Sequence, residues 1–427
     1  MKIKGLSIEN YLLVISYLLI FFFFIFQGAI YSPDTYSYIN ANIYRSPGYP
    51  IFTKFLQFVS GVYFDFVIVA IQLLISLIGI HVFFKIASKI FQLKWIEKLF
   101  LFVILIFPFF KPLLIANNIS SEGLSYPLYL LFLSSVLYFF SQNTSRAFYF
   151  ILTNLTILIL TRGQFIILPL LILTSYILIF KKQIICKLHV KRIILLCLLP
   201  LAVLIMDKTY HLLKDGVFVS TPFTYLCVSG SAFYVSKSED INFINSKDDK
   251  QIFEDCYTFI NDNNWLLSSK KRNSYKDYYQ HFHNNLGNIC NYTLHDRGTK
   301  FYVDKGYSIV EARIAIENTC KDIAPILIKN NFKEWIRLYY SNLIHSFKSP
   351  FILFFIMITL IFSGFKIITT SDFRYSYLFL FSSLILSNAV IVVFASHSIM
   401  RYLFYNFALF YLIFLILIRL TKHEKQT

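Results

Sequence analysis

Five ionisable residues near the ends of apolar stretches have the chemistry to act together: Asp34, Arg45, Glu122, Arg162 and Arg401. A charged side chain at the end of a membrane span is costly when it faces lipid, so such residues usually mark a site. Arginine suits an anionic phosphate through its charge and its forked donors, and a carboxylate can take the proton of an acceptor hydroxyl or amine. These residue types predict a phosphate-binding site beside a general base.

Asp34 and Arg45 belong to one polar loop with strong turn signals. Ser32-Pro33 ends the preceding helix, because proline disfavours helix in the residue before it. Asp34 then begins a short helix, where a carboxylate is favoured, so it is either a plain helix cap or a catalytic base. Arg45 precedes the rigid turn Pro47-Gly48-Tyr49-Pro50 and an amphipathic stretch over 51–59.

The other charged residues have simple structural explanations that the sequence leaves open. Arg162 and Arg401 suit side chains that reach from a helix end to the membrane interface. Glu122 suits the first turn of a helix, where the helix dipole favours an acid. His397 is typical of an interfacial histidine, and His281-x-His283 has no obvious third metal ligand.

Membrane-spanning helices are the elements that must position these residues. Hydrophobic residues make up 57% of the chain, and they come in runs near the 20 or so residues that cross a bilayer. The fold class predicted is therefore an all-α polytopic membrane protein. We expect ten spans, at about 8–30, 65–84, 98–115, 123–140, 147–161, 164–180, 193–206, 350–368, 375–395 and 402–419.

The positive residues predict which face of the membrane each loop occupies. With ten spans, the basic clusters fall on one side, and such clusters mark the cytoplasm. This side holds Lys2, Lys4, Lys85, Lys89, Lys94, Lys98, Lys181, Lys182, Lys187, Lys191, Arg192, Lys366, Arg374, Arg419, Lys422 and Lys425. Both termini are then cytoplasmic, and all five site candidates and His397 lie at the outer face. The same rule accounts for the net charge of +17 without a nucleic-acid partner.

The longest polar segment, 207–349, is predicted to be a mainly helical extracytoplasmic domain between two transmembrane modules, 1–206 and 350–427. Hydrophobic residues recur at near-helical spacing from Glu311 to Phe347. Four of the six cysteines fall in this domain, where an oxidising compartment would favour disulfides of undetermined connectivity. The four candidates are Cys227, Cys256, Cys290 and Cys320.

The first loop resembles that of membrane glycosyltransferases of the GT-C fold. An acid at the loop start followed by Arg45-Ser-Pro-Gly-Tyr-Pro50 is similar to the group of dolichyl-phosphate-mannose protein mannosyltransferases and aminoarabinose transferases, a glycosyltransferase family 39-like pattern common in bacterial surface-polysaccharide enzymes. Three later segments match in order and position: Ser121-Glu122-Gly-Leu, Thr161-Arg162-Gly163 and Met400-Arg401-Tyr402. One departure is Thr35, because many members of the group carry a second acid beside the first.

The resemblance implies an inverting enzyme of the bacterial plasma membrane that moves a sugar from a polyprenyl phosphate to a glycan, lipid or protein acceptor. Asp34 and Glu122 would be catalytic, with a divalent metal possible at this pair. Arg45, Arg162 and Arg401 would hold the donor phosphate, and Tyr36, Tyr49, His397 and Tyr402 would contact substrate. We expect Asp34 about one sugar width from the arginines and not paired with them.

Two other classes of protein fit the same composition. A surface-polysaccharide polymerase or ligase also combines many spans with a large external loop, and would rely on arginine and histidine in late external loops. A lipid-linked glycan transporter would show interrupted helices in matching halves and charges near mid-membrane. The ionisable residues gather at one membrane boundary and no internal repeat is visible, so a transporter is disfavoured.

Overall fold

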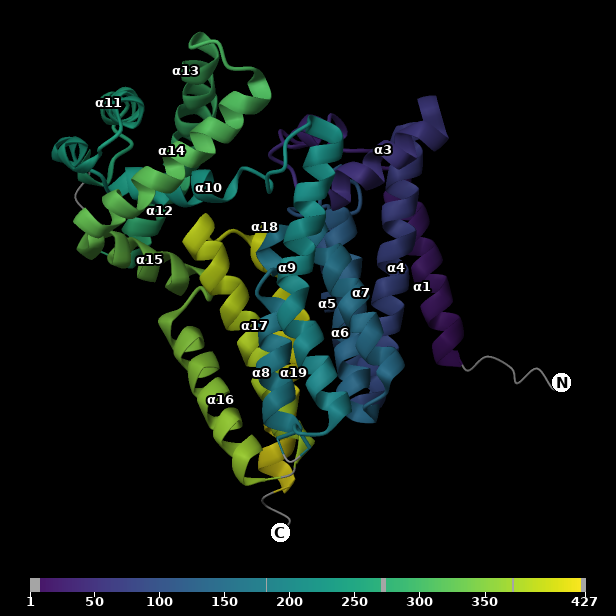
Figure 1. Ribbon diagram of the computed structural model, residues 1–427. Coiled ribbons are helices and arrows are strands. Elements are labelled where there is room, and N and C mark those ends of the chain that lie inside the picture. Colours follow the sequence, from purple (N-terminus) through teal and green to yellow (C-terminus); the bar gives the residue numbers. More distant parts are fainter. Residues whose placement is uncertain (1–7, 182, 270–273, 371, 424–427) are drawn as a thin grey trace.

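The computed structural model describes residues 8–181, 183–269, 274–370 and 372–423 (Figure 1). Lys2, Lys4, Lys182 and Lys425 of the charge pattern lie outside the described residues, as does the side chain of Lys422. Within the described ranges the chain is helical and has no β-strand; an isolated bridge joins Ile30 and Asn118.

In the part of the chain that the structure describes, seven helical segments are long and apolar enough to cross a membrane. The protein is therefore a polytopic, membrane-embedded helical protein. Four of the segments are single helices: α1 (Ile8–Ile25) near the N-terminus, α9 (Lys187–Asp215) before the polar domain, and α16 (Pro350–Thr369) and α17 (Phe373–Ala395) after it. The others are α6 (Glu122–Gln142), the pair α3 (Gly48–Ser60) and α4 (Phe64–Ile90), and the pair α18 (Met400–Leu403) and α19 (Phe407–His423).

The remaining predicted spans are also helical, but they are shorter. These are α5 (Trp95–Ile106), α7 (Ser145–Thr161) and α8 (Leu168–Ile179). Helix α6 forms the centre of the bundle, since 83% of its apolar window is buried, whereas α1 buries 17% and leaves phenylalanine side chains on the outer surface. The buried charged end of α6 therefore belongs to the most buried of these seven segments.

The polar domain is a separate helical unit with its own hydrophobic core. It contains α10 (Thr224–Val235), α11 (Lys247–Asp262), α12 (Tyr275–Gly287), the π-helix η6 (Asn288–Arg297), α13 (Gly298–Asp304), α14 (Ile309–Asn330) and α15 (Phe332–Ser346). The predicted helical region from Glu311 is confirmed, and it breaks at Asn331 into α14 and α15. Since α9 runs on to Asp215, the compact part of the domain begins later than position 207.

The domain sits beyond the end of the bundle at which α3 and α18 lie (Figure 1). It contacts the α17–α18 loop directly, because the hydroxyl of Tyr279 on α12 donates to the carbonyl of Ser398 at 2.8 Å. The hydroxyl of Ser398 in turn donates to the carbonyl of Asn342 on α15 at 2.9 Å. The loop that precedes Arg401 is thus held by two helices of the domain.

The expected disulfides are not formed in this structure: Cys227, Cys256, Cys290 and Cys320 are free thiols. Three of them are buried in the domain core, where the Cys256 and Cys290 thiols each point to a backbone carbonyl at 3.8 Å. Burial raises the pKa of the Cys256 thiol to about 12, which favours the unreactive protonated form.

Candidate functional site

All five charged candidates meet at the domain-facing end of the bundle in one chain of ion pairs, which we call the ionic cluster: Asp34, Arg45, Glu122, Arg162 and Arg401. They come from the first loop, the start of α6, the end of α7 and α18. The cluster joins residues that are 367 positions apart in sequence. The prediction that these side chains share one face is therefore confirmed.

Asp34 bridges two arginines. Its Oδ1 accepts a hydrogen bond from Arg45 Nη2 at 2.7 Å, and its Oδ2 accepts one from Arg401 Nη1 at 2.8 Å. The residue begins α2 (Thr35–Ile39), but its side chain makes no capping hydrogen bond, so the helix-cap explanation is wrong for the carboxylate. Burial alone would raise the pKa of Asp34, yet the charges of Arg45 and Arg401 hold that pKa below its usual value.

The expectation that Asp34 stands one sugar width from the arginines is also wrong. Three guanidinium groups converge at this end of the bundle, and the carboxylates of Asp34 and Glu122 are their ion-pair partners among the described residues. Leaving Arg45 or Arg401 without a counter-ion in a partly buried position would be costly. In this state Asp34 therefore acts as the counter-ion of both.

Glu122 is the innermost member of the cluster, with 2% of its side chain exposed. It receives Arg162 Nη1 at 2.5 Å, and it pairs with Arg401 through both Nε and Nη2. Such a forked arginine–carboxylate pair fixes geometry as well as charge. Glu122 is thus a buried anchor that holds two arginines in place.

The Arg-x-Pro-Gly-Tyr-Pro run positions Arg45 at the site. Its Nε donates to the hydroxyl of Ser37 at 2.7 Å, and its guanidinium carbon lies 4.5 Å from the centre of the Tyr38 ring. The glycine of the run, Gly48, packs against Thr161, the residue before Arg162. The first loop and the arginine turn at the end of α7 are therefore built against each other.

Tyr49 is fully buried beneath the site, so its side chain is not available to bind a ligand. Its hydroxyl donates to Oε1 of Gln72 at 2.7 Å, and Gln72 Nε2 donates to the carbonyl of Ala116 at 2.9 Å. A β-carbon on Gly123 would lie 2.4 Å from that same amide oxygen. Gln72 was missed from the sequence, although an amide in the middle of an apolar span is itself a signal.

The other proposed substrate contacts fall in different places. Tyr402 lies against the cluster, with the guanidinium carbon of Arg162 5.0 Å from its ring centre. Tyr36 is exposed and contacts Tyr31 at 5.6 Å between ring centres. His397 pairs with His283 of the domain, with 3.1 Å between their Nδ1 atoms, and so belongs to the domain contact.

Three neighbours not predicted from the sequence complete the cluster. The hydroxyl of Ser121 accepts hydrogen bonds from Tyr38 at 3.1 Å and from Arg162 Nη1 at 3.3 Å. Gln164 accepts from Arg162 Nε at 2.5 Å. Ser121 thus links the first loop to the end of α7, and Gln164 links Arg162 to α17 through its Nε2, which donates to Oδ1 of Asn388 at 3.1 Å. Small polar residues in turns gave no pattern from which to predict this.

The electrostatic balance of the cluster favours an anion. Three guanidinium groups face two carboxylates, which leaves an excess of one positive charge. A cavity of about 120 Å³ adjoins Glu122 and Arg401, enough for a few water molecules. Among the described residues no group of three metal-ligating side chains occurs, and both carboxylates already share their oxygens with arginines, so the donor set suits an anion better than a divalent cation.

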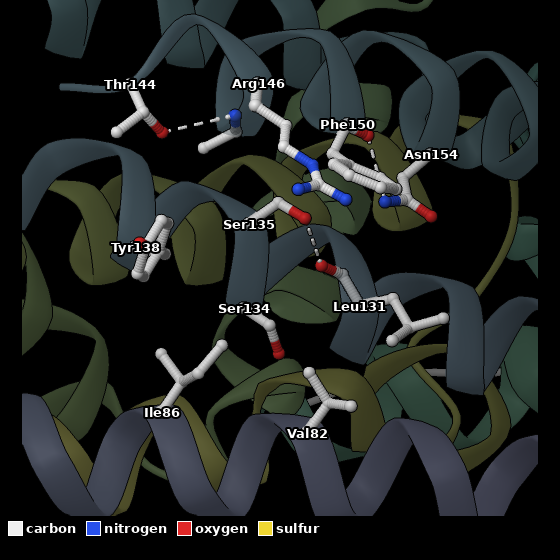
Figure 2. A pocket seen from close by; sticks show the side chains of 11 residues that line it. Val82, Ile86, Leu131, Ser134, Ser135, Tyr138, Thr144, Arg146, Phe150 and Asn154 are labelled. Atoms are coloured by element: carbon white, nitrogen blue, oxygen red, sulfur yellow. Dashed lines mark hydrogen bonds between the residues drawn. The ribbon is translucent and has the colours of Figure 1, made fainter. Parts of the chain in front are cut away.

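A larger pocket lies elsewhere, between α4, α6 and α7 (Figure 2). It measures about 560 Å³ and is lined mostly by apolar side chains. Its polar groups serve their own helices: Ser135 donates to the carbonyl of Leu131 at 2.8 Å, and Asn154 to that of Phe150 at 2.9 Å. With Arg146 as its one charged lining residue, this pocket lacks converging groups for chemistry.

Comparisons with family models, with curated proteins and with solved structures give no match. The ionic cluster itself therefore carries the functional argument.

Proposed function

We propose that this protein is a GT-C-type glycosyltransferase that moves a sugar from a polyprenyl-phosphate donor to a glycan, lipid or protein acceptor. The observation that carries the proposal is the ionic cluster with its excess positive charge, at the end of the bundle that the polar domain covers. A lipid-linked phosphate must leave water without entering hydrocarbon, so fixed positive groups must meet it at that depth.

The ion pairs of Asp34 suggest how binding leads to chemistry. A donor phosphodiester carries one negative charge on two free oxygens, as does the carboxylate that bridges Arg45 and Arg401, so it competes with Asp34 for these guanidinium groups. A carboxylate released from its arginines is a stronger base, because the charges that lower its pKa are then shared with the phosphate. Phosphate binding would thus prepare Asp34 to accept a proton.

In the transfer step, one bond forms and one bond breaks at the anomeric carbon of the sugar. The acceptor oxygen or nitrogen attacks the anomeric carbon from the face opposite the phosphate, and its proton passes to Asp34. The bond between the anomeric carbon and the phosphate oxygen breaks, and the arginines stabilise the negative charge left on the polyprenyl phosphate. Glu122 is a positioning residue in this scheme, because both of its oxygens hold Arg162 and Arg401.

In this proposal the chain crosses a bacterial plasma membrane ten times, and both termini are cytoplasmic. The three short helices α5, α7 and α8 would complete the ten. The basic residues Lys85, Lys89 and Arg374 lie at the loops that this arrangement places in the cytoplasm. The ionic cluster and the domain then face outward, where lipid-linked sugars are used.

The domain offers a surface for an acceptor. A groove of about 510 Å³ runs beside α14 and is lined by carboxylates, an amide and two tyrosines, Tyr302 and Tyr307. Such groups hydrogen-bond to hydroxyls and pack on apolar sugar faces. The polymerase alternative is less well supported, since His397, the histidine it would need in the late loop, faces His283 and not the cluster.

A transfer assay on purified protein in lipid nanodiscs tests the proposal. The probe is a panel of radiolabelled polyprenyl-phosphate sugars with envelope glycan as acceptor. We expect the wild type to release polyprenyl phosphate from one donor, and Asp34→Asn to lower the rate about 100- to 10,000-fold, the usual contribution of a general base. Asp65→Asn is the control, because Asp65 lies on the same side and pairs with Tyr31 outside the cluster. Full activity of Asp34→Asn would refute the role of Asp34.

A further inference from the structure

A second cationic group lies next to the ionic cluster, on the domain. Arg313 of α14 places its guanidinium carbon 4.5 Å from the centre of the Tyr44 ring, and Arg45 places its own 5.2 Å from that same ring. Tyr44 therefore stands between an arginine of the cluster and an arginine of the domain. Asp34 joins Arg401 to Arg45, and the Tyr44 ring joins Arg45 to Arg313, so the three arginines lie along one path.

Arg313 lacks the partners that the other site arginines have. It makes no ion pair within the part of the chain that the structure describes, and its buried Nε has no hydrogen-bond partner there. Burial lowers the pKa of Arg313 below its usual value, which reflects the cost of a charge that is not neutralised. A partly buried guanidinium group whose Nε is buried without a partner is an expensive feature unless it meets a ligand.

A histidine of the domain also has a buried nitrogen without a partner among the described residues, and it faces the ring of Tyr44. His295 lies at the end of the π-helix η6, and its ring centre is 4.8 Å from that of Tyr44. Asp296 accepts from its Nδ1 at 2.9 Å, which fixes the ring, while its buried Nε2 has no partner among the described residues. π-Helical segments are frequent at functional sites. Two unsatisfied nitrogens on two elements of the domain thus meet at one tyrosine of the first loop.

We propose that Arg313 binds a second phosphoryl group, so that the lipid-linked substrate is a polyprenyl diphosphate. This inference rests on the proposed function, in which Arg45 and Arg401 bind the phosphoryl group beside the reacting sugar. The two phosphoryl groups of a diphosphate are adjacent, and Arg45 of the ionic cluster and Arg313 of the domain both lie against the Tyr44 ring. A monophosphate would leave Arg313 unneutralised. The domain therefore contributes to donor recognition as well as to acceptor binding.

Equilibrium binding to the full-length protein in nanodiscs tests the assignment. The probes are polyprenyl monophosphate and polyprenyl diphosphate of equal chain length, measured by native mass spectrometry. We expect the wild type to bind the diphosphate about tenfold more tightly, the effect of one charged hydrogen-bonded contact. Arg313→Gln should remove this preference and leave monophosphate binding unchanged, whereas Arg313→Lys should keep most of it.

The matched control is Arg337→Gln, which removes the same charge from an exposed position on α15. It should behave as the wild type does. Equal binding of the two lipids by the wild type, or a preference that survives in Arg313→Gln, would overturn the inference while leaving the proposed function intact. A wild type that binds neither lipid would instead contradict the proposed function.

Discussion

Gly48 and Thr161 lie in closer contact than any other residue at position 48 would allow. A β-carbon on Gly48 would stand 2.6 Å from Oγ1 of Thr161 and 2.8 Å from its Cα. The second of these atoms is backbone, so no side-chain rotation relieves the clash. Since Arg162 follows Thr161, this contact ties the first loop to an arginine of the ionic cluster.

Gly48→Ala should therefore disturb the site. We expect the free energy of unfolding to fall by about 1–3 kcal/mol, as for other overpacked positions, and transfer to fall further because Arg162 must shift. Thermal unfolding and the transfer assay measure the two effects. Gly163→Ala is the control, since a β-carbon there meets no atom within 4 Å, and it should change neither. Equal behaviour of the two variants would show that the contact does not position Arg162.

The buried pair of Glu122 and Arg162 makes a prediction about stability. Glu122→Gln removes the charge that neutralises Arg162 in a position almost closed to solvent, so the free energy of unfolding should fall by about 3–5 kcal/mol. Adding Arg162→Gln to this variant should recover part of the loss, because the unpaired charge is then gone. Thermal unfolding in detergent measures both.

A surface ion pair provides the comparison. Glu9 pairs with Lys98 at 2.7 Å and has 37% of its side chain exposed, so Glu9→Gln should cost less than about 1 kcal/mol. A double variant at positions 122 and 162 that is less stable than Glu122→Gln alone would contradict the assigned role of Glu122 as a counter-ion.

The contact between the domain and the α17–α18 loop should weaken in acid. His283, His345 and His397 gather there with Lys348, whose Nζ lies 2.9 Å from Nε2 of His345. Burial, together with neighbouring positive charge, lowers the pKa of His345 to about 4 and that of His397 to about 3. Burial also lowers the pKa of His283.

These pKa values determine in which direction stability changes with pH. An unfolded histidine takes a proton near pH 6.5, but folded His345 and His397 stay neutral to about pH 4 and about pH 3, so stability is lost as pH falls from about 6.5 to 4 and below. Hydrogen exchange of α12 and of residues 396–399 should rise over this range. His345→Gln should flatten the response, and a profile identical to that of the wild type would show that these histidines do not govern it.

Much of this site follows from sequence order and charge. The parity of the basic loops put Asp34, Glu122 and Arg401 at one end of the bundle, and the structure joins them there. The direct pairing of Asp34 with arginine did not follow, because it depends on how closely α18 approaches the first loop. No local pattern encodes that distance between residues 367 positions apart.

The directions in which side chains point could not be predicted from the sequence either. The resemblance of the first loop assigns Tyr49 to substrate, but its position in α3 points it into the core toward Gln72. The role of Arg313 could not be predicted from the sequence, since its helix is amphipathic and the Tyr44 ring that it contacts lies in a distant loop. Contacts between the domain and the membrane bundle were therefore the part that the sequence could not predict.

The most direct test of the central claim is the affinity of the purified protein for polyprenyl monophosphate. The account predicts saturable binding by the wild type and by Arg374→Gln, since Arg374 pairs with Asp372 at the other end of α17. It predicts binding weaker by about ten- to a hundredfold in Arg401→Gln, which loses a charged contact to the phosphate. Equal affinity in all three proteins, or no binding by the wild type, would contradict the assignment of the ionic cluster as the phosphate site.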